Sequence, residues 1–205
     1  MLEEIKRAFV ENKVAILISI AILVISLILG YCLEGYLYSY LNPVVDEMTK
    51  KVQSGVLKLT FQDIFLNNLR VIFGMFIFGI LFCFSALILV FNGFFVGYYV
   101  ASANDFFAVL MYIVPHGIFE LPSCALACAA GFVLFNFIYK FIKALIGDTD
   151  DSISEKLRNS YDESHDKLRQ AIILFIISVI LMVIAGIIEA YFTIPIAQFI
   201  FSIFG

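Results

Sequence analysis

The sequence has few charged residues and no tryptophan. Only 15% of its 205 residues are charged, whereas about 25% are charged in ordinary soluble domains. By contrast, 62% are hydrophobic, and the mean hydropathy is +1.01. A water-soluble core of this size could not bury so much apolar surface, so a soluble enzyme is excluded. The sequence indicates an integral membrane protein, and its Lys and Arg residues form no basic stripe of the kind that binds nucleic acid.

Catalytic motifs are also missing. The sequence has no HExxH, no GxSxG and no GxxxxGK[ST], which are the motifs of zinc proteases, serine hydrolases and phosphate-binding loops. We therefore expect no enzymatic activity and no cofactor. The four cysteines all lie in apolar stretches, where thiols pack as small hydrophobic groups, so neither disulfides nor a cysteine zinc site is expected.

Charge-free runs predict an all-α bundle of about five membrane-spanning helices. The expected spans cover residues 14–33, 71–91, 94–114, 122–143 and 171–194. Each is close to the length needed to cross a hydrocarbon core about 30 Å thick. Within the long apolar run, breaks are expected at Asn92-Gly93 and between Pro115 and Pro122, because a residue that precedes proline disfavours helical geometry.

The basic residues predict the orientation. With five spans and a cytoplasmic N-terminus, most Lys and Arg residues lie on the inner side of the plasma membrane, as is usual. A four-span alternative makes 94–120 a re-entrant hairpin, puts the N-terminus outside and satisfies the same rule. The five-span interpretation is preferred because the first helix usually sets the orientation, and its basic flank is N-terminal.

Two polar segments separate the apolar runs. Residues 34–70 are expected to form an extracytoplasmic loop, in which Val44, Val45 and Met48 recur at helical spacing among charged residues. An interfacial helix lying on lipid is the main interpretation, and a partner-binding helix is the alternative. Residues 147–170 are expected to form a cytoplasmic helical loop that leads into the last span.

Small residues recur at every fourth position in two stretches. They are Gly93, Gly97 and Ala101, and Ser123, Ala127 and Gly131. Such spacing gives a helix a smooth strip that another helix can approach closely. The neighbouring helix belongs either to the same chain or to another subunit. Besides the lipid bilayer, we therefore expect contacts with membrane-protein partners or self-association.

Acidic residues inside apolar runs are the main candidates for function. Asp105, Glu120 and Glu189 would each cost on the order of 3 kcal/mol at the bilayer centre, so each needs a polar lining, a partner or a proton. His116 lies four residues before Glu120, and on a regular helix the two would form a hydrogen-bonded pair, a proton relay or half a metal site. A structural role for Glu120, next to a helix starting at Pro122, is the alternative.

Residues 115–122 read Pro-His-Gly-Ile-Phe-Glu-Leu-Pro. This segment resembles the Pro-His-Gly-x-x-Glu-Leu-Pro signature of the stage II sporulation protein M family. Asn92-Gly93 with Gly97, and residues 188–190 with Thr193, resemble other motifs of that family. The resemblance implies a multi-span membrane protein, which in spore-forming bacteria is a scaffold that works with two cell-wall-degrading proteins.

Three functions are consistent with these features. The leading hypothesis is a non-enzymatic membrane scaffold or assembly protein. The second is a transporter or channel in which Asp105, Glu120 and Glu189 form a polar path. The third is an intramembrane metalloenzyme with His116, Glu120 and Glu189 as ligands, which is disfavoured because the sequence reveals no group that would orient those ligands.

Overall fold

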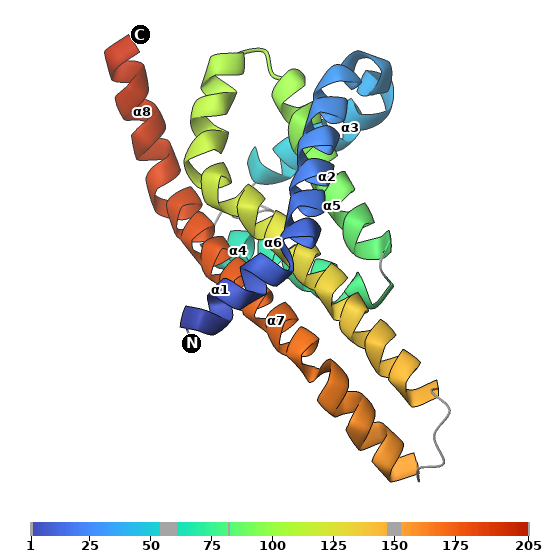
Figure 1. Ribbon diagram of the computed structural model, residues 1–205. Helices are drawn as coiled ribbons and strands as arrows, with labels where there is room; N and C mark the ends of the chain where they lie inside the picture. Colours follow the sequence, from blue (N-terminus) through green and yellow to red (C-terminus); the bar gives the residue numbers. More distant parts are fainter. Residues whose placement is uncertain (1, 54–60, 82, 147–152, 205) are drawn as a thin grey trace.

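The computed structural model describes residues 2–53, 61–81, 83–146 and 153–204, and these residues are helical almost throughout, with no strand among them (Figure 1). The helical elements are α1 (Leu2–Glu11), α2 (Lys13–Cys32), α3 (Glu34–Gln53), α4 (Phe61–Ile77), the 3-10 turn η1 (Phe78–Leu81), α5 (Cys83–Ala101), α6 (Phe106–Ile146), α7 (Ile153–Ile187), the π-helical turn η2 (Ile188–Phe192) and α8 (Thr193–Phe204). The all-α prediction is confirmed.

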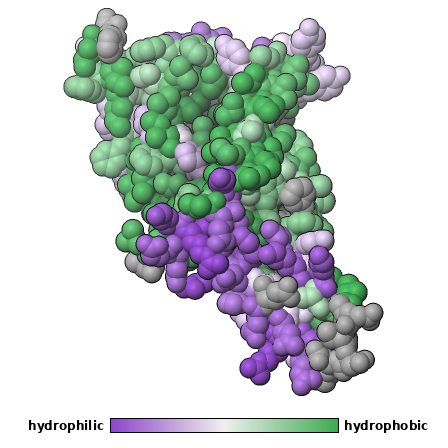
Figure 2. Space-filling model, in the orientation of Figure 1, coloured by the Kyte–Doolittle hydropathy of each residue, from purple (hydrophilic) through white to green (hydrophobic). Residues whose placement is uncertain are grey.

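Four helical stretches in the described part of the chain are long and apolar enough to cross a membrane. They are Lys13–Cys32, Cys83–Ala101, Phe106–Ile146 and Ser164–Ile203, and Phe65–Leu81 is a shorter apolar helix. In Figure 2 apolar residues cover the upper body, and hydrophilic residues gather over α1 and the lower end. This distribution is typical of a membrane-embedded body with one polar end. The expected number of five crossings stays a prediction.

Two helix boundaries differ from the sequence-based prediction. Helix α5 continues through Asn92-Gly93 and ends at Ala101, and α6 continues through both Pro115 and Pro122. The expected spans 94–114 and 122–143 are therefore not separate elements, and within the range of the alternative hairpin, 94–120, the chain turns between the end of α5 and the start of α6. Proline is tolerated inside membrane helices because neighbouring helices stabilise the interrupted turns. Helix α6 bends instead of breaking, between its green and yellow parts in Figure 1.

The polar segments also form helices. Helix α3 begins at Glu34 and continues through Pro43, so the helix expected in the 34–70 loop is longer than its apolar spacing indicated. Its contact with lipid stays a prediction. Residues 153–170 form the first part of α7, as expected, whereas residues 147–152 lie outside the described part of the chain. The last span was expected to end at residue 194, whereas the apolar helix continues beyond that residue as α8.

Helix α6 is the central helix of the bundle. All of its residues from 123 to 134 are buried, and α7 packs antiparallel along it (Figure 1). The hydroxyl group of Ser123 donates to the Ser178 carbonyl at 2.7 Å, and the Ser178 hydroxyl donates to the Ser123 carbonyl at 2.8 Å. These reciprocal hydrogen bonds join α6 to α7 inside the apolar body, where no water competes for them.

The small residues lie at close helix contacts. Gly97 faces the Leu27 backbone of α2, and a Cβ atom there would lie 2.9 Å from the Leu27 carbonyl carbon. A Cβ atom on Gly131 would lie 2.6 Å from the Met75 carbonyl oxygen of α4. Helices α2 and α5, and helices α4 and α6, therefore approach each other at distances that only glycine permits.

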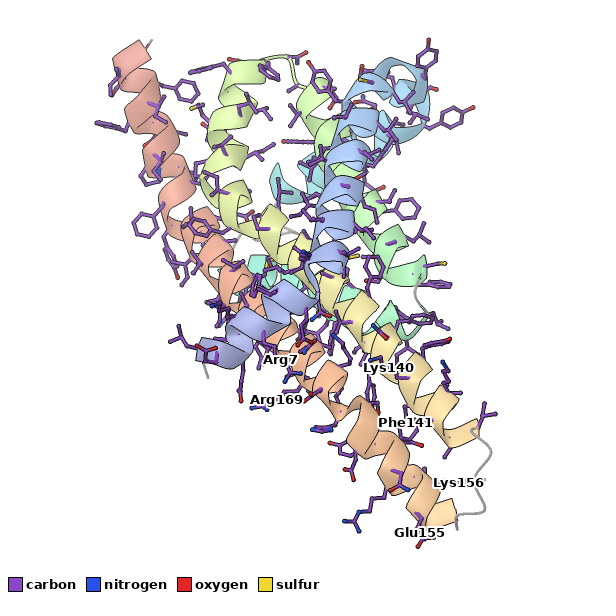
Figure 3. All side chains as sticks on the ribbon, viewed as in Figure 1. Arg7, Lys140, Phe141, Glu155, Lys156 and Arg169 are labelled. Atoms are coloured by element: carbon purple, nitrogen blue, oxygen red, sulfur yellow. The ribbon has the colours of Figure 1, made fainter. Side chains whose placement is uncertain are left out.

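A charged cluster at the polar end holds α1 across α7. Glu11 accepts hydrogen bonds from Arg7 at 2.6 Å, Gln170 at 2.7 Å and Lys167 at 3.3 Å. The Arg7 guanidinium, with help from Gln170, lowers the pKa of Glu11 to about 2. Figure 3 shows Arg7 and Arg169 where the two helices cross. The N-terminus and the first part of α7 therefore lie on the same side of the molecule.

Candidate functional site

Three polar side chains converge between α6 and η2. His116 and Glu120 extend from α6 and Glu189 from η2, and one ligand atom of each lies within 4.8 Å of the other two. The Nε2 atom of His116 is 3.8 Å from Oε2 of Glu120. We call these three residues the polar triad. Their meeting follows from the continuity of α6 through residues 115–122, because residues four apart on a regular helix share one face.

The π-helical turn supplies the third member of the triad. Within η2 the hydrogen bonds widen by one residue, and the Thr193 N–H donates to the Ile188 carbonyl. In a regular α-helix the ring of Pro195 would clash with the Tyr191 carbonyl, which lies in this turn. Such π-helical turns are frequent at functional sites. Here the wider turn lies just before Pro195 and carries Glu189, which meets the face of α6.

Thr193 orients the imidazole of His116. Its hydroxyl donates to the Ile188 carbonyl at 3.2 Å and lies 3.4 Å from Nδ1 of His116. When the carbonyl accepts the one hydroxyl hydrogen, the hydroxyl oxygen is left to accept from His116 in the tautomer that carries the hydrogen on Nδ1. In the neutral imidazole, Nε2 therefore carries a free lone pair on the side of Glu120.

Sequence reasoning did not identify Thr193 as part of the site. Its spacing of four residues from Glu189 would have placed both on one helical face, which is a usable signal.

A cavity on the α5 side reaches two members of the triad, His116 and Glu120. It has a volume of about 230 Å³ and is lined by His116 and Glu120 of α6 and by Phe95, Val96 and Tyr99 of α5, among others. Because a water molecule occupies roughly 30 Å³ in the liquid, this space can hold several waters or a hydrated ion. A second hollow of about 540 Å³ between α6 and the η2–α8 segment is lined only by apolar residues.

Asp105 does not join the triad. It precedes α6, where its carboxylate accepts a hydrogen bond from the Ala108 N–H at 2.9 Å, and so it caps the N-terminus of the helix. Along the helix it lies roughly 16 Å from His116, at 1.5 Å per residue. The polar path expected through Asp105, Glu120 and Glu189 is therefore not continuous. The sequence did not reveal this, because charge alone does not distinguish a capping residue from a buried one.

The remaining predicted packing residues have separate roles. Ser123 joins α6 to α7, Ala127 is fully buried, and Ala101 ends α5 in a half-buried position. Gly93 lies close to Leu23 on α2, whose carbonyl oxygen would be 3.1 Å from a Cβ atom. All of these contacts lie within one chain.

The family model described as Stage II sporulation protein M matches residues 14–194, a range that contains the whole polar triad. The chain belongs to this family. It is 30% identical to "Uncharacterized protein MJ0706" of Methanocaldococcus jannaschii over 98% of this chain and 91% of that protein. It is 32% identical to "Uncharacterized protein MJ0793" of the same organism over 71% of this chain and 78% of that protein. No solved structure matches it.

In this member of the Stage II sporulation protein M family, the triad presents only acceptors when the Nδ1–H of His116 donates to Thr193, because the lone pair of Nε2 then faces the two carboxylates. Glu120 and Glu189 have no Lys or Arg partner within 4.0 Å among the described residues. Two unneutralised carboxylates in an apolar bundle are costly. The arrangement can lower that cost by binding a cation or by taking up protons.

Proposed function

We propose that this Stage II sporulation protein M family member is a multi-pass plasma-membrane protein that binds a small cation at the polar triad and moves it across the bilayer. The observation that carries this proposal is the convergence of His116, Glu120 and Glu189 without a basic partner in the described part of the chain. Neither this role nor the alternative below involves a catalysed reaction.

The depth of the triad supports a transport role. His116 and Glu120 lie roughly 15 and 21 Å along α6 from Phe106, at 1.5 Å per residue, whereas the hydrocarbon core is about 30 Å thick. Ionisable groups near the bilayer centre are functional candidates by default. Transporters commonly bind their ions where a membrane helix departs from regular geometry, and η2, which carries Glu189, is such a departure between α7 and α8.

The charged end supports a cytoplasmic N-terminus. Helix α1 binds to the polar part of α7, so the basic residues of both segments lie on one side of the molecule. Positively charged segments next to membrane helices are usually cytoplasmic. The proposed orientation therefore puts α1 and the 147–170 segment inside the cell.

Flux through proteoliposomes tests the transport proposal. The purified chain is reconstituted, and gradients of H⁺, Na⁺, K⁺ and Mn²⁺ are followed in turn with fluorescent indicators. We expect protein-dependent flux of at least one cation, reduced at least tenfold by Glu120→Gln, which removes the charge at nearly constant shape. Asp105→Asn, which keeps a good capping residue, is the matched control and retains the flux. Absence of flux for all four cations, or flux that Glu120→Gln leaves unchanged, contradicts the proposal.

A scaffold or assembly role is the second candidate. The ends of α6 and α7 extend beyond the apolar body as a two-helix arm, which carries Lys140, Phe141, Glu155 and Lys156 (Figure 3). Arms of this kind offer a polar surface to another protein, and this one also leaves Tyr161 half exposed.

Photo-crosslinking from Tyr161 at native expression levels tests the scaffold role. A defined crosslinked partner supports it. A chain that stays solitary in mild detergent and gives no crosslink contradicts it.

A further inference from the structure

The polar triad has the donor atoms of an open transition-metal site. We propose that Nε2 of His116 and one carboxylate oxygen each from Glu120 and Glu189 bind a divalent first-row transition-metal ion, with Thr193 as a positioning residue. This inference rests on the proposed cation-binding function and names the class of cation.

The donor set favours a transition metal over an alkali or alkaline-earth ion. One imidazole nitrogen and two carboxylate oxygens suit Zn²⁺, Mn²⁺, Fe²⁺ and Co²⁺, whereas Ca²⁺ and Mg²⁺ prefer oxygen ligands alone. The charge disfavours the alkali ions, because a divalent ion neutralises both Glu120 and Glu189 in the apolar bundle. A monovalent ion would leave one negative charge there, which is costly.

The geometry needs only a small adjustment to hold a metal. Ligand atoms that bind one ion tetrahedrally at about 2.1 Å lie about 3.4 Å apart. The His116–Glu120 separation is 3.8 Å, and all three ligand atoms lie within 4.8 Å of one another. Side-chain rotation at Glu189 can close the remaining gap. Three protein ligands leave at least one coordination position open, which allows the ion to exchange.

Thr193 supplies the outer support that metal-binding histidines need. Such histidines usually donate their second N–H to a fixed acceptor, which sets the tautomer and ring orientation. In this chain the Thr193 hydroxyl lies 3.4 Å from Nδ1 of His116, in position to accept that N–H, and it donates to the Ile188 carbonyl. Glu189 lies in the π-helical turn η2, and Thr193 directly follows it. This one turn therefore provides the ligand Glu189 and places Thr193, which orients the ligand His116.

Titration of the purified, chelator-treated chain with Co²⁺ tests this inference. Bound Co²⁺ gives visible absorption bands whose intensity reports its coordination, and Zn²⁺ displaces it. We expect one Co²⁺ per chain, with affinity at least about 100-fold weaker in Glu189→Gln. Loss of the outer support in Thr193→Val should weaken binding about 10- to 100-fold, and Thr193→Ser, which retains the hydroxyl, should restore it.

Asp105→Asn is the control and keeps the wild-type affinity. Size-exclusion chromatography and thermal unfolding of each variant identify those that are folded. If Glu189→Gln is unstable, the comparison of Thr193→Val with Thr193→Ser still tests the site. A folded wild-type chain that binds no Co²⁺, or binding unchanged by both Glu189→Gln and Thr193→Val, overturns the metal site. Glu120-dependent flux of H⁺, Na⁺ or K⁺ without Co²⁺ binding overturns it and leaves the proposed function standing. Co²⁺ binding without flux supports the site and rejects transport.

Discussion

The close contact between α2 and α5 makes Gly97→Ala a sharp test of the packing. An added methyl group at Gly97 would lie 2.9 Å from the Leu27 carbonyl carbon and closer still to its oxygen. Both atoms belong to the backbone of α2, so no side-chain rotation can relieve the overlap. One helix must move away from the other.

The expected cost follows from comparison with a glycine that has room. At Gly74 of α4 the nearest atom to an added methyl group is the Ile88 Cδ1 atom at 3.6 Å, an ordinary contact. Both substitutions gain the same helix propensity of up to about 1 kcal/mol, which cancels in the comparison. Gly97→Ala should therefore be less stable than Gly74→Ala by the overpacking cost of about 1–3 kcal/mol. This corresponds to roughly 5- to 150-fold in the unfolding equilibrium.

Energy transfer between α2 and α5 provides the assay. Cys32 and Cys83 are exposed and accept dyes, whereas the other two cysteines are buried. Reversible unfolding in mixed micelles with increasing SDS then reports the separation of the two helices. A Gly97→Ala chain as stable as Gly74→Ala, or more stable, would refute the backbone contact.

Further outcomes are expected at three other places. Ser178→Ala should destabilise the chain by about 0.6–1.7 kcal/mol, and a double-mutant cycle with Ser123→Ala should show that the two losses are not additive. Because the pKa of Glu11 falls from 4.5 to about 2 on folding, its stabilising contacts are present above pH 4.5 and are lost as the pH falls toward 2. Pepsin cleavage of α1 should increase over that interval, with Glu3→Gln following wild type and Glu11→Gln showing no such transition. Asp105→Ala should lower the free energy of unfolding by about 1 kcal/mol and leave the affinity for Co²⁺ unchanged. A tenfold loss of Co²⁺ affinity would contradict the role of Asp105 as a helix cap.

The features that the sequence predicts correctly are local ones. Composition is sufficient for the membrane class and the helical fold, since both follow from the shortage of charge. The four-residue spacing of His116 and Glu120 is enough to place them on one face, provided that the helix is regular. The resemblance at residues 115–122 leads to the family, which the match over residues 14–194 confirms.

The features that the sequence does not predict depend on packing. Pro115 and Pro122 indicate a break when read locally, yet the helices around α6 keep it continuous. Glu189 is 69 residues from Glu120, and the sequence groups the two only in hypotheses of a polar path or a metal site, because the spacing itself does not require that they meet. The hydrogen bond from His116 to Thr193 likewise requires η2 to pack on α6.

The position of a bound metal can be measured directly from crystals of the chain grown with Zn²⁺, using anomalous diffraction at the zinc edge. The polar triad predicts one anomalous peak per chain, about 2.0–2.2 Å from Nε2 of His116 and from a carboxylate oxygen of each of Glu120 and Glu189. A peak at any other position alone, or no peak among these three side chains, would contradict a transition-metal site between α6 and η2.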